Sequence, residues 1–237
     1  MPQLTDGRII PPWTYRPGPD VSLLPPSGLV SAQNIARKAA MAGCNAATSG
    51  ATEIDILIAV STCLADLNVA DVWTITNVGV GANAHTCFPT QGPSGLAMVE
   101  NDLAMIDVHP ITPDGFWGDC TRCTVIGDNP AARDGLRDLT HIYKEVMVRA
   151  QSGIRACDLF GTMHERMVSE GFTLLDTLEN IGHSLSPGAA YLNEFIDANN
   201  HTPMWGAWAV EPFAARDGAA VKVEDLFWFG RDECIMI

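Results

Sequence analysis

Residues 210–225, Val-Glu-Pro-Phe-Ala-Ala-Arg-Asp-Gly-Ala-Ala-Val-Lys-Val-Glu-Asp, predict a β-hairpin with two carboxylates on one face. Asp217-Gly218 is a favoured two-residue turn, and a turn centred between these residues pairs strand positions whose numbers sum to 435. Glu211 then lies directly opposite Glu224, and both side chains project from the same face. Because directly opposed like charges destabilise a hairpin, this pair predicts a cation beside the strands.

A second hairpin is predicted upstream, where residues 110–115 are rich in turn-forming residues. An odd-length loop centred on Pro113 would place Asp107 opposite Asp119. A tight turn on Asp114-Gly115 would instead shift the pairing and separate the two aspartates. The sequence leaves both registers open.

The acidic residues of the two hairpins have apolar neighbours. Asp107 lies in the run Met-Ile-Asp-Val, Glu211 follows Trp-Ala-Val, and Glu224 lies in Val-Lys-Val-Glu-Asp-Leu. A single acidic residue in a hairpin is usually a solvated surface group, but a carboxylate among apolar residues is costly to bury without a partner. The set therefore favours a pair of divalent ions, such as manganese, cobalt, iron or zinc, which activate water for hydrolysis.

Five short motifs occur in a fixed order along the chain. They are Asp107, Gly118-Asp119-Cys-Thr-Arg122, Gly182-His183, Val210-Glu211-Pro212 and Val223-Glu224-Asp225. In this order, and over roughly residues 29–237, they resemble the pita-bread metallopeptidase family of methionine aminopeptidase, aminopeptidase P, prolidase and creatinase. The resemblance implies an α+β fold, in which an antiparallel curved sheet carries helices on its outer face. It also implies two metal ions bound by Asp107, Asp119, His183, Glu211 and Glu224.

The resemblance implies further roles for single side chains. The glutamate that matches Glu211 doubles as a proton shuttle, and the segment Gly79 to His85 resembles one that ends in a histidine facing the substrate. The family's second active-site histidine is replaced by Ala190, and His201 is the candidate for its place.

His109 follows Asp107 by two residues and so shares its face of the strand. A supporting role beside the metals, a replacement catalytic role and a structural role all stay open for it.

These residues predict a dinuclear metal-dependent hydrolase in which a metal-activated water attacks a carbonyl carbon. The resemblance favours an aminopeptidase or X-Pro peptidase. Ala190 favours the alternative of a non-peptide C–N substrate, as in creatinase, or of a specialised metabolite. A third hypothesis, an inactive binding module, ranks lower because all five metal-binding side chains are present.

The chain divides into a proline-rich N-terminal arm over 1–27 and a single catalytic domain over 28–237. Apolar residues at helical spacing predict helices over 29–48, 52–67, 131–151 and 157–170. Runs of β-branched and apolar residues predict strands over 72–80, 103–108, 116–126, 173–178, 205–214 and 220–229.

The net charge of −14 argues against nucleic acid and anionic membranes as partners. A small peptide or small-molecule substrate fits better, and the arm makes a homodimer an option. The sequence shows neither a signal peptide nor an apolar run of about 18 residues, which predicts a cytoplasmic protein.

The seven cysteines, including Cys120 and Cys123 within a predicted strand, are expected to be reduced thiols rather than a zinc or redox pair.

Overall fold

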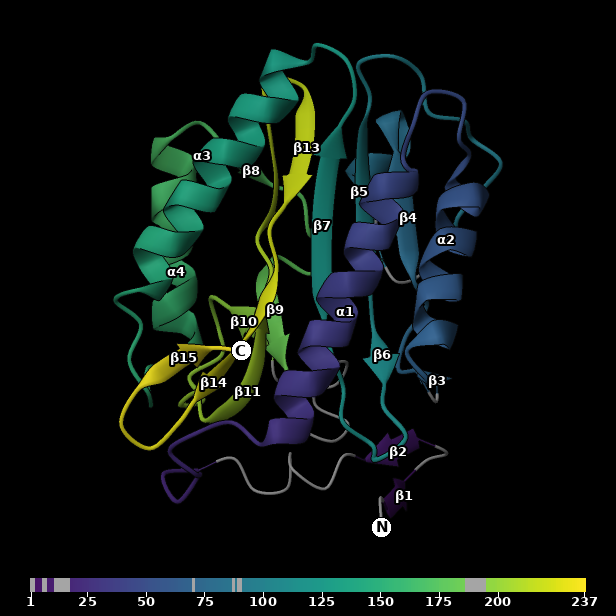
Figure 1. Cartoon of the computed structure of the whole chain (residues 1–237). Helices are drawn as coiled ribbons and strands as arrows, with labels where there is room; N and C mark the ends of the chain where they lie inside the picture. Colours follow the sequence, from purple (N-terminus) through teal and green to yellow (C-terminus); the bar gives the residue numbers. More distant parts are fainter. Residues whose placement is uncertain are drawn as a thin grey trace.

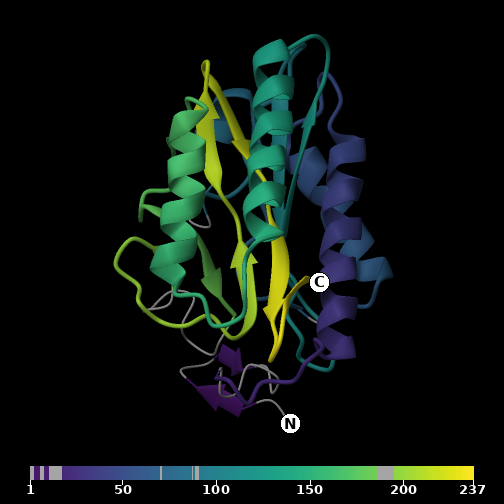
Figure 2. The ribbon, with the colours of Figure 1, turned by 90° about the vertical axis from the view of Figure 1, so that its left-hand side faces the viewer.

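Two pairs of helices flank the strands (Figure 1). The computed structural model describes residues 18–69, 71–86, 88, 91–185 and 195–237, and the backbone of 3–5 and 8–10. The first pair, α1 (Ser27–Ala46) and α2 (Glu53–Asp66), lies on one side of the molecule. The second pair, α3 (Pro130–Met147) and α4 (Ala156–Ser169), lies on the other side, and Figure 2 shows both of its helices in front of the strands.

The strands of the described residues form three larger antiparallel sheets and two small pairs. The first sheet has the order β4 (Asn77–Val80), β5 (Leu103–Val108) and β7 (Cys120–Val125). The second has the order β10 (Phe195–Asp197), β9 (Asn180–Ser184), β11 (Gly206–Val210), β14 (Asp225–Phe229) and β15 (Cys234–Met236). The third has the order β13 (Ala219–Lys222), β12 (Phe213–Arg216) and β8 (Thr173–Leu174). The small pairs are β3 (Asp71–Val72) with β6 (Pro110–Ile111), and β1 (Gln3–Thr5) with β2 (Arg8–Ile10).

Two of the helices, α2 and α3, begin at residues that supply capping groups. At the start of α2, Thr52 Oγ1 accepts a hydrogen bond from Asp55 N, and the Asp55 carboxylate accepts one from Thr52 N, which makes a reciprocal capping box. At the start of α3, Asn129 Oδ1 accepts from Ala132 N, and Pro130 occupies the first helical position. Each predicted helix therefore starts within two residues of its expected place.

The core divides along the helix pairs. Helix α1 packs across β5 and β7 and buries Ala36, Ala40 and Ile106 with their neighbours. Helices α3 and α4 pack on β13 and β10 and enclose a second cluster around Leu139 and Trp208. Both clusters lie against strands that carry the acidic residues, so the helices hold these strands in place.

The downstream hairpin has the predicted register. Phe213 pairs with Lys222 across β12 and β13, and Val210 pairs with Asp225 across β11 and β14. Both pairs obey the predicted sum of 435, and Asp217-Gly218 makes the turn with positive φ at both residues (52° and 80°). The strands pass from one sheet to the next near Pro212, which lacks an N–H for the ladder. Glu211 and Glu224 therefore lie at the junction of the two sheets.

The upstream hairpin has neither of the two registers that the sequence left open. Asp107 pairs with Thr121, so paired residue numbers sum to 228 and Asp119 is not directly opposite Asp107. The turn is centred on Asp114, because the Thr112 hydroxyl accepts from Phe116 N and donates to Asp114. The loop is therefore centred one position beyond Pro113, and it is not the tight turn on Asp114-Gly115 either. Asp119 still shares a face with Asp107, diagonally across the strands.

Two predicted strands are interrupted in the structure. The strand expected over 72–80 ends at Val72 and resumes at Asn77. Next to the break, Trp73 N donates to His109 O and the indole N–H donates to Gly118 O. The strand expected over 205–214 breaks at Glu211-Pro212, as described above.

The predicted arm over 1–27 lies partly outside the described residues. Where it is described, Trp228 Nε1 donates to Ser22 O, which fixes this stretch against β14. Within the described part of the chain, no helix combines the length and the apolar character that crossing a membrane requires.

Candidate metal centre

The five side chains that the resemblance assigns to metal converge on one place. Asp107 comes from β5, Asp119 precedes β7, and His183 lies in β9. Glu211 follows β11, and Glu224 lies between β13 and β14. His183 Nε2 is 3.4 Å from Asp119 Oδ2 and 3.4 Å from Glu211 Oε1. The centre therefore joins strands that belong to different sheets.

Lys222, at the end of β13, contacts three of the carboxylates. Its Nζ lies 2.9 Å from Asp107 Oδ2, 2.6 Å from Glu211 Oε2 and 3.2 Å from Glu224 Oε2. The side chain is buried. The sequence analysis missed Lys222, although its two-residue spacing from Glu224 was a signal that both could share a face.

Several carboxylate oxygens at the centre accept no hydrogen bond from the described residues. Asp119 and Glu224 are completely buried, yet Asp107 Oδ1, both Asp119 oxygens and Glu224 Oε1 accept no hydrogen bond from the described residues. Leaving such oxygens buried and unpaired costs about 1–3 kcal/mol each, and more for charged groups. The donor set thus fits divalent cations, which oxygen and imidazole ligands bind well.

Two overlapping groups of side chains have the spacing of metal ligands. Asp107, Glu211 and Glu224 form one group, and Asp107, His109 and Asp119 form the other. In each group, one ligand atom from every residue lies within 4.8 Å of the others. Lys222 contacts every member of the first group but uses one oxygen of each carboxylate, so Asp107 Oδ1 and Glu224 Oε1 stay free.

Burial and mutual repulsion perturb the acids of the centre. Desolvation raises the pKa of Asp119 well above its usual value, and the charges of Asp107 and Glu211 add to the rise. Desolvation and the neighbouring aspartates likewise raise the pKa of Glu224. Burial would also raise the pKa of Asp107, but the charges of His109 and Lys222 hold it well below its usual value.

The ammonium of Lys222 is held charged by its neighbours. Burial alone would lower its pKa, but the charges of Asp107, Glu211 and Glu224 raise it well above the usual value. The centre thus combines Lys222 with four acidic side chains, and divalent ions can supply the positive charge that lets all four ionise.

His183 is oriented by its own strand. Its Nδ1 lies 3.1 Å from Ser184 O, which leaves Nε2 facing the carboxylates, the arrangement common among metal-binding histidines. The preceding Gly182 has φ 144°, and a Cβ at this position would collide with the carbonyl oxygen of Ala209. The Gly-His pair is therefore a steric requirement of the β9–β11 contact.

Helix α1 fixes the backbone of Asp119. Gln33 Nε2 donates to Asp119 O at 2.8 Å, and Gln33 Oε1 accepts from Asp119 N at 2.9 Å. Arg37, one turn further along α1, binds Asp225 together with Arg122 of β7. Asp225 is thus tied to the scaffold by arginines, which distinguishes it from its neighbour Glu224.

The catalytic roles of His85 and His201 stay predictions, and the structure shows their own neighbours. His85 lies in the short 3₁₀ helix η2 (Gly81–Thr86) and lines a separate hollow with Asp102, Asn129 and Asp217. His201 is exposed, and its Nδ1 lies 3.3 Å from Cys157 Sγ. Ala190, at the position of the family's second histidine, falls outside the described residues.

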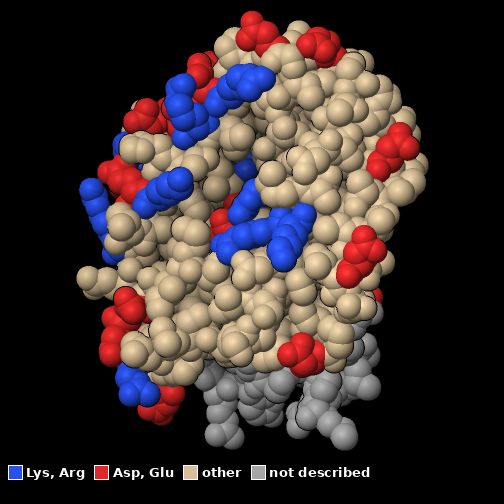
Figure 3. All heavy atoms as spheres, in the orientation of Figure 1, with Lys and Arg blue, Asp and Glu red and all other residues tan. Residues whose placement is uncertain are grey.

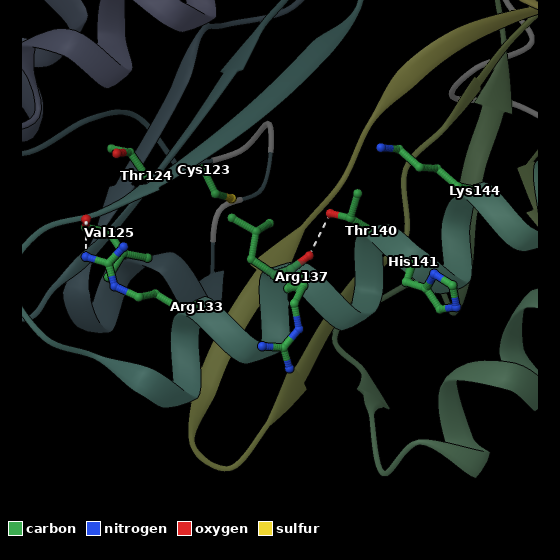
Figure 4. A pocket seen from close by; sticks show the side chains of 9 residues that line it. Cys123, Thr124, Val125, Arg133, Arg137, Thr140, His141 and Lys144 are labelled. Carbon is green, nitrogen blue, oxygen red and sulfur yellow. Dashed lines mark hydrogen bonds between the residues drawn. The ribbon is translucent and has the colours of Figure 1, made fainter.

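A groove with basic side chains lies between α3 and β7. Figure 4 shows Arg133, Arg137, His141 and Lys144 along it, with Cys123 near its floor. Arg137 is paired with Asp134 and Asp138, and none of the five predicted ligands lines the groove. Figure 3 shows basic side chains around the hollow of this face and acidic ones mostly at its margins. The groove is distinct from the metal centre.

The described cysteines match the expectation of free thiols. Six of them, including Cys120 and Cys123, form no disulfide, and Cys87 lies outside the described residues. Cys120 and Cys123 both lie in β7, as predicted. Burial raises the pKa of Cys123 to about 12, so this thiol is protonated at neutral pH.

Comparisons with known proteins identify the fold and the family of the chain. Methionine aminopeptidase from Chlamydia pneumoniae is 26% identical over 152 residues, which cover 61% of this chain and 46% of that protein. The match thus spans about half of the length of the curated relative. Prolidase from Pyrococcus furiosus superimposes with a TM-score of 0.76 at 19% sequence identity. The match covers 90% of this chain and 64% of the prolidase chain. Methionine aminopeptidase from Thermotoga maritima has a TM-score of 0.69 at 17% sequence identity. This match covers 91% of this chain and 98% of the aminopeptidase chain.

The solved structures confirm the predicted α+β pita-bread fold. A family model described as metallopeptidase family M24 matches residues 28–228, which is most of the chain. The chain therefore belongs to metallopeptidase family M24.

Proposed function

We propose that this chain is a divalent-metal-dependent hydrolase with Asp107, Asp119, His183, Glu211 and Glu224 as its metal ligands. The observation that carries the proposal is the buried cluster of carboxylate oxygens without partners, into which His183 Nε2 points. When bound, divalent ions lower the pKa of water enough to make hydroxide available near neutral pH. Two ions are proposed, because the two oxygens of Asp119 face different imidazoles.

Glu211 is the proposed proton shuttle. Its side chain is 18% exposed, whereas those of Asp107, Asp119 and Glu224 are at most 3% exposed. A general acid or base needs access to the substrate or to a water molecule, and Glu211 has the most access of the four carboxylates. It also contacts His183 through Oε1 and Lys222 through Oε2, which orients its carboxylate.

The proposed substrate is a peptide cleaved at its N-terminus or at an X-Pro bond. Family membership supports a peptide, and the names of the similar proteins include methionine aminopeptidase and prolidase. A small non-peptide C–N compound is the second candidate. Ala190, which stands where the family has its second active-site histidine, favours it.

The test uses the full chain after chelation and reloading with Mn²⁺ or Co²⁺. Hydrolysis is measured with a Met-Ala-Ser peptide, an X-Pro dipeptide and small amides or amidines. Metal-dependent hydrolysis that is lost in Glu211→Gln supports the proposal, and the substrate that is turned over decides between the candidates. If neither ion binds or stabilises the chain, the proposal fails. Metal binding without hydrolysis of any tested compound would favour a binding module.

A further inference from the structure

His109 is not among the five predicted ligands, yet it lies among them. The register of the upstream hairpin places His109 directly opposite Asp119, since paired residue numbers there sum to 228. Asp107, two residues earlier, is on the same face. The side chain of His109 is only 3% exposed, so it is part of the buried centre and not of the surface.

Nε2 of His109 lies between two carboxylates without a hydrogen bond to either. Nε2 lies 3.2 Å from Asp107 Oδ1 and 3.5 Å from Asp119 Oδ1. Neither oxygen accepts a hydrogen bond from any residue that the structure describes. Both oxygens lie within ion-pair distance of the ring, yet neither is in hydrogen-bonding geometry with it, so both can still serve as ligands of an ion.

These separations match those between ligands of a common metal ion. With metal–ligand bonds of about 2.1 Å, neighbouring ligands lie about 3.0 Å apart at octahedral angles and about 3.4 Å apart at tetrahedral angles. The opposite side of Asp119 has the same arrangement, since Oδ2 faces His183 Nε2 at 3.4 Å. Asp119 thus has an imidazole nitrogen at each of its two unpaired oxygens.

Trp73 holds both imidazoles. Its ring makes edge-to-face contacts with His109 at 4.9 Å and with His183 at 5.6 Å between centroids, and it stacks on Trp117. The indole N–H is anchored to Gly118 O at 2.9 Å. His109 Nδ1 has no partner among the described residues, so these ring contacts set the orientation of the imidazole.

We propose that His109 is a sixth metal-ligating side chain, which binds one ion through Nε2 together with Asp107 and Asp119. This inference rests on the proposed metal-dependent function. It gives each of the two ions one neutral nitrogen ligand, His109 on the side of Asp107 and His183 on the side of Glu211.

The test counts histidine ligands in the Co²⁺-loaded full chain by proton NMR. The ring N–H of each histidine bound to Co²⁺ gives a strongly shifted signal that disappears in deuterated water. We expect two such signals in the wild type, one in His109→Gln, and two in the control His141→Gln, which changes an exposed histidine of α3. His85→Gln and His201→Gln should also retain both signals. Calorimetry should show that His109→Gln lowers the affinity for one of the two ions at least about tenfold.

The outcomes separate this inference from the proposed function. One shifted signal in the wild type, or two in His109→Gln, overturns the sixth ligand and leaves the metal-dependent function standing. No bound Co²⁺ at all overturns both. If His109→Gln does not fold, the wild-type count and the His85 and His201 variants still decide, because loss of a signal in either variant assigns the second ligand elsewhere.

Discussion

Lys222 shows how one side chain can shape a metal centre without being a ligand. Its ammonium contacts one oxygen each of Asp107, Glu211 and Glu224, and the second oxygens of Asp107 and Glu224 stay free. This arrangement orients the carboxylates before any ion binds. Sequence reasoning found the acids from their apolar neighbours. It missed Lys222 because the contact with Asp107 depends on how β13 approaches β5, which no local pattern records.

Replacing Lys222 by methionine should destabilise the metal-free protein. The change keeps most of the length of the side chain but leaves buried carboxylates without their counter-charge. Removing one partner of a buried ion pair costs about 3–5 kcal/mol. With saturating Mn²⁺ the decrease in the free energy of unfolding should be smaller, because the bound ions supply positive charge. Urea unfolding with and without metal measures both values. The exposed Lys144→Met is the control, and equal stability of metal-free Lys222→Met and wild type would contradict the assigned role.

Metal binding should release protons from the centre. The pKa values of Asp119 and Glu224 are raised in the metal-free protein, so both hold protons at pH values where ordinary carboxyl groups are ionised. Ions bind only the ionised forms, so affinity should rise with pH until the raised pKa values are passed and then level off. Calorimetry in buffers of different ionisation enthalpy measures the protons released. An affinity that is constant from pH 5 to 8, with no proton release, would exclude this coupling.

At the scale of elements, the two hairpins show what sequence can predict. The Asp217-Gly218 turn is fixed by its own two residues, so its register was predicted and holds across both strand pairs. The upstream turn is fixed by the Thr112 hydroxyl, which binds both Phe116 N and Asp114. Counting turn-forming residues could not reveal that choice. The corrected register is also what places His109, rather than Asp107, opposite Asp119.

The contact between α1 and the start of β7 should control metal affinity. Gln33→Met removes two hydrogen bonds to the backbone of Asp119 and leaves a buried N–H and a buried carbonyl unpaired. At about 1–3 kcal/mol for each unsatisfied group, we expect a loss of about 2–4 kcal/mol in unfolding free energy. Metal affinity should also fall, because Asp119 is no longer held in place. Gln151→Met, at an exposed position, is the control for urea unfolding and metal titration. Unchanged affinity would show that Asp119 does not need this anchor.

At the scale of the whole molecule, the centre joins two groups of strands, each packed against its own helices. Asp107 and Asp119 belong to the hairpin of β5 and β7, which α1 covers. His183 and Glu211 belong to β9 and the end of β11, in the sheet beside α4. Motif order in the sequence predicted that these residues meet, but only through the family resemblance. The packing that brings them together consists of long-range contacts that spacing along the chain does not encode.

Removing metal should therefore destabilise the β5–β7 hairpin and the β9–β11 sheet together. At one hundred times the dissociation constant, a bound ion adds about 2.7 kcal/mol, and at about 2–4 °C per kcal/mol for a chain of this size, chelation should lower Tm by about 5–10 °C. Because the ligands come from both halves, hydrogen exchange should accelerate in β5 and β7 as well as in β9 and β11. Asp119→Asn is the matched control: it weakens the carboxylate shared by the proposed ions, so chelator should change its Tm little. If chelation accelerates exchange in only one of these sheets, the ions do not join the two halves.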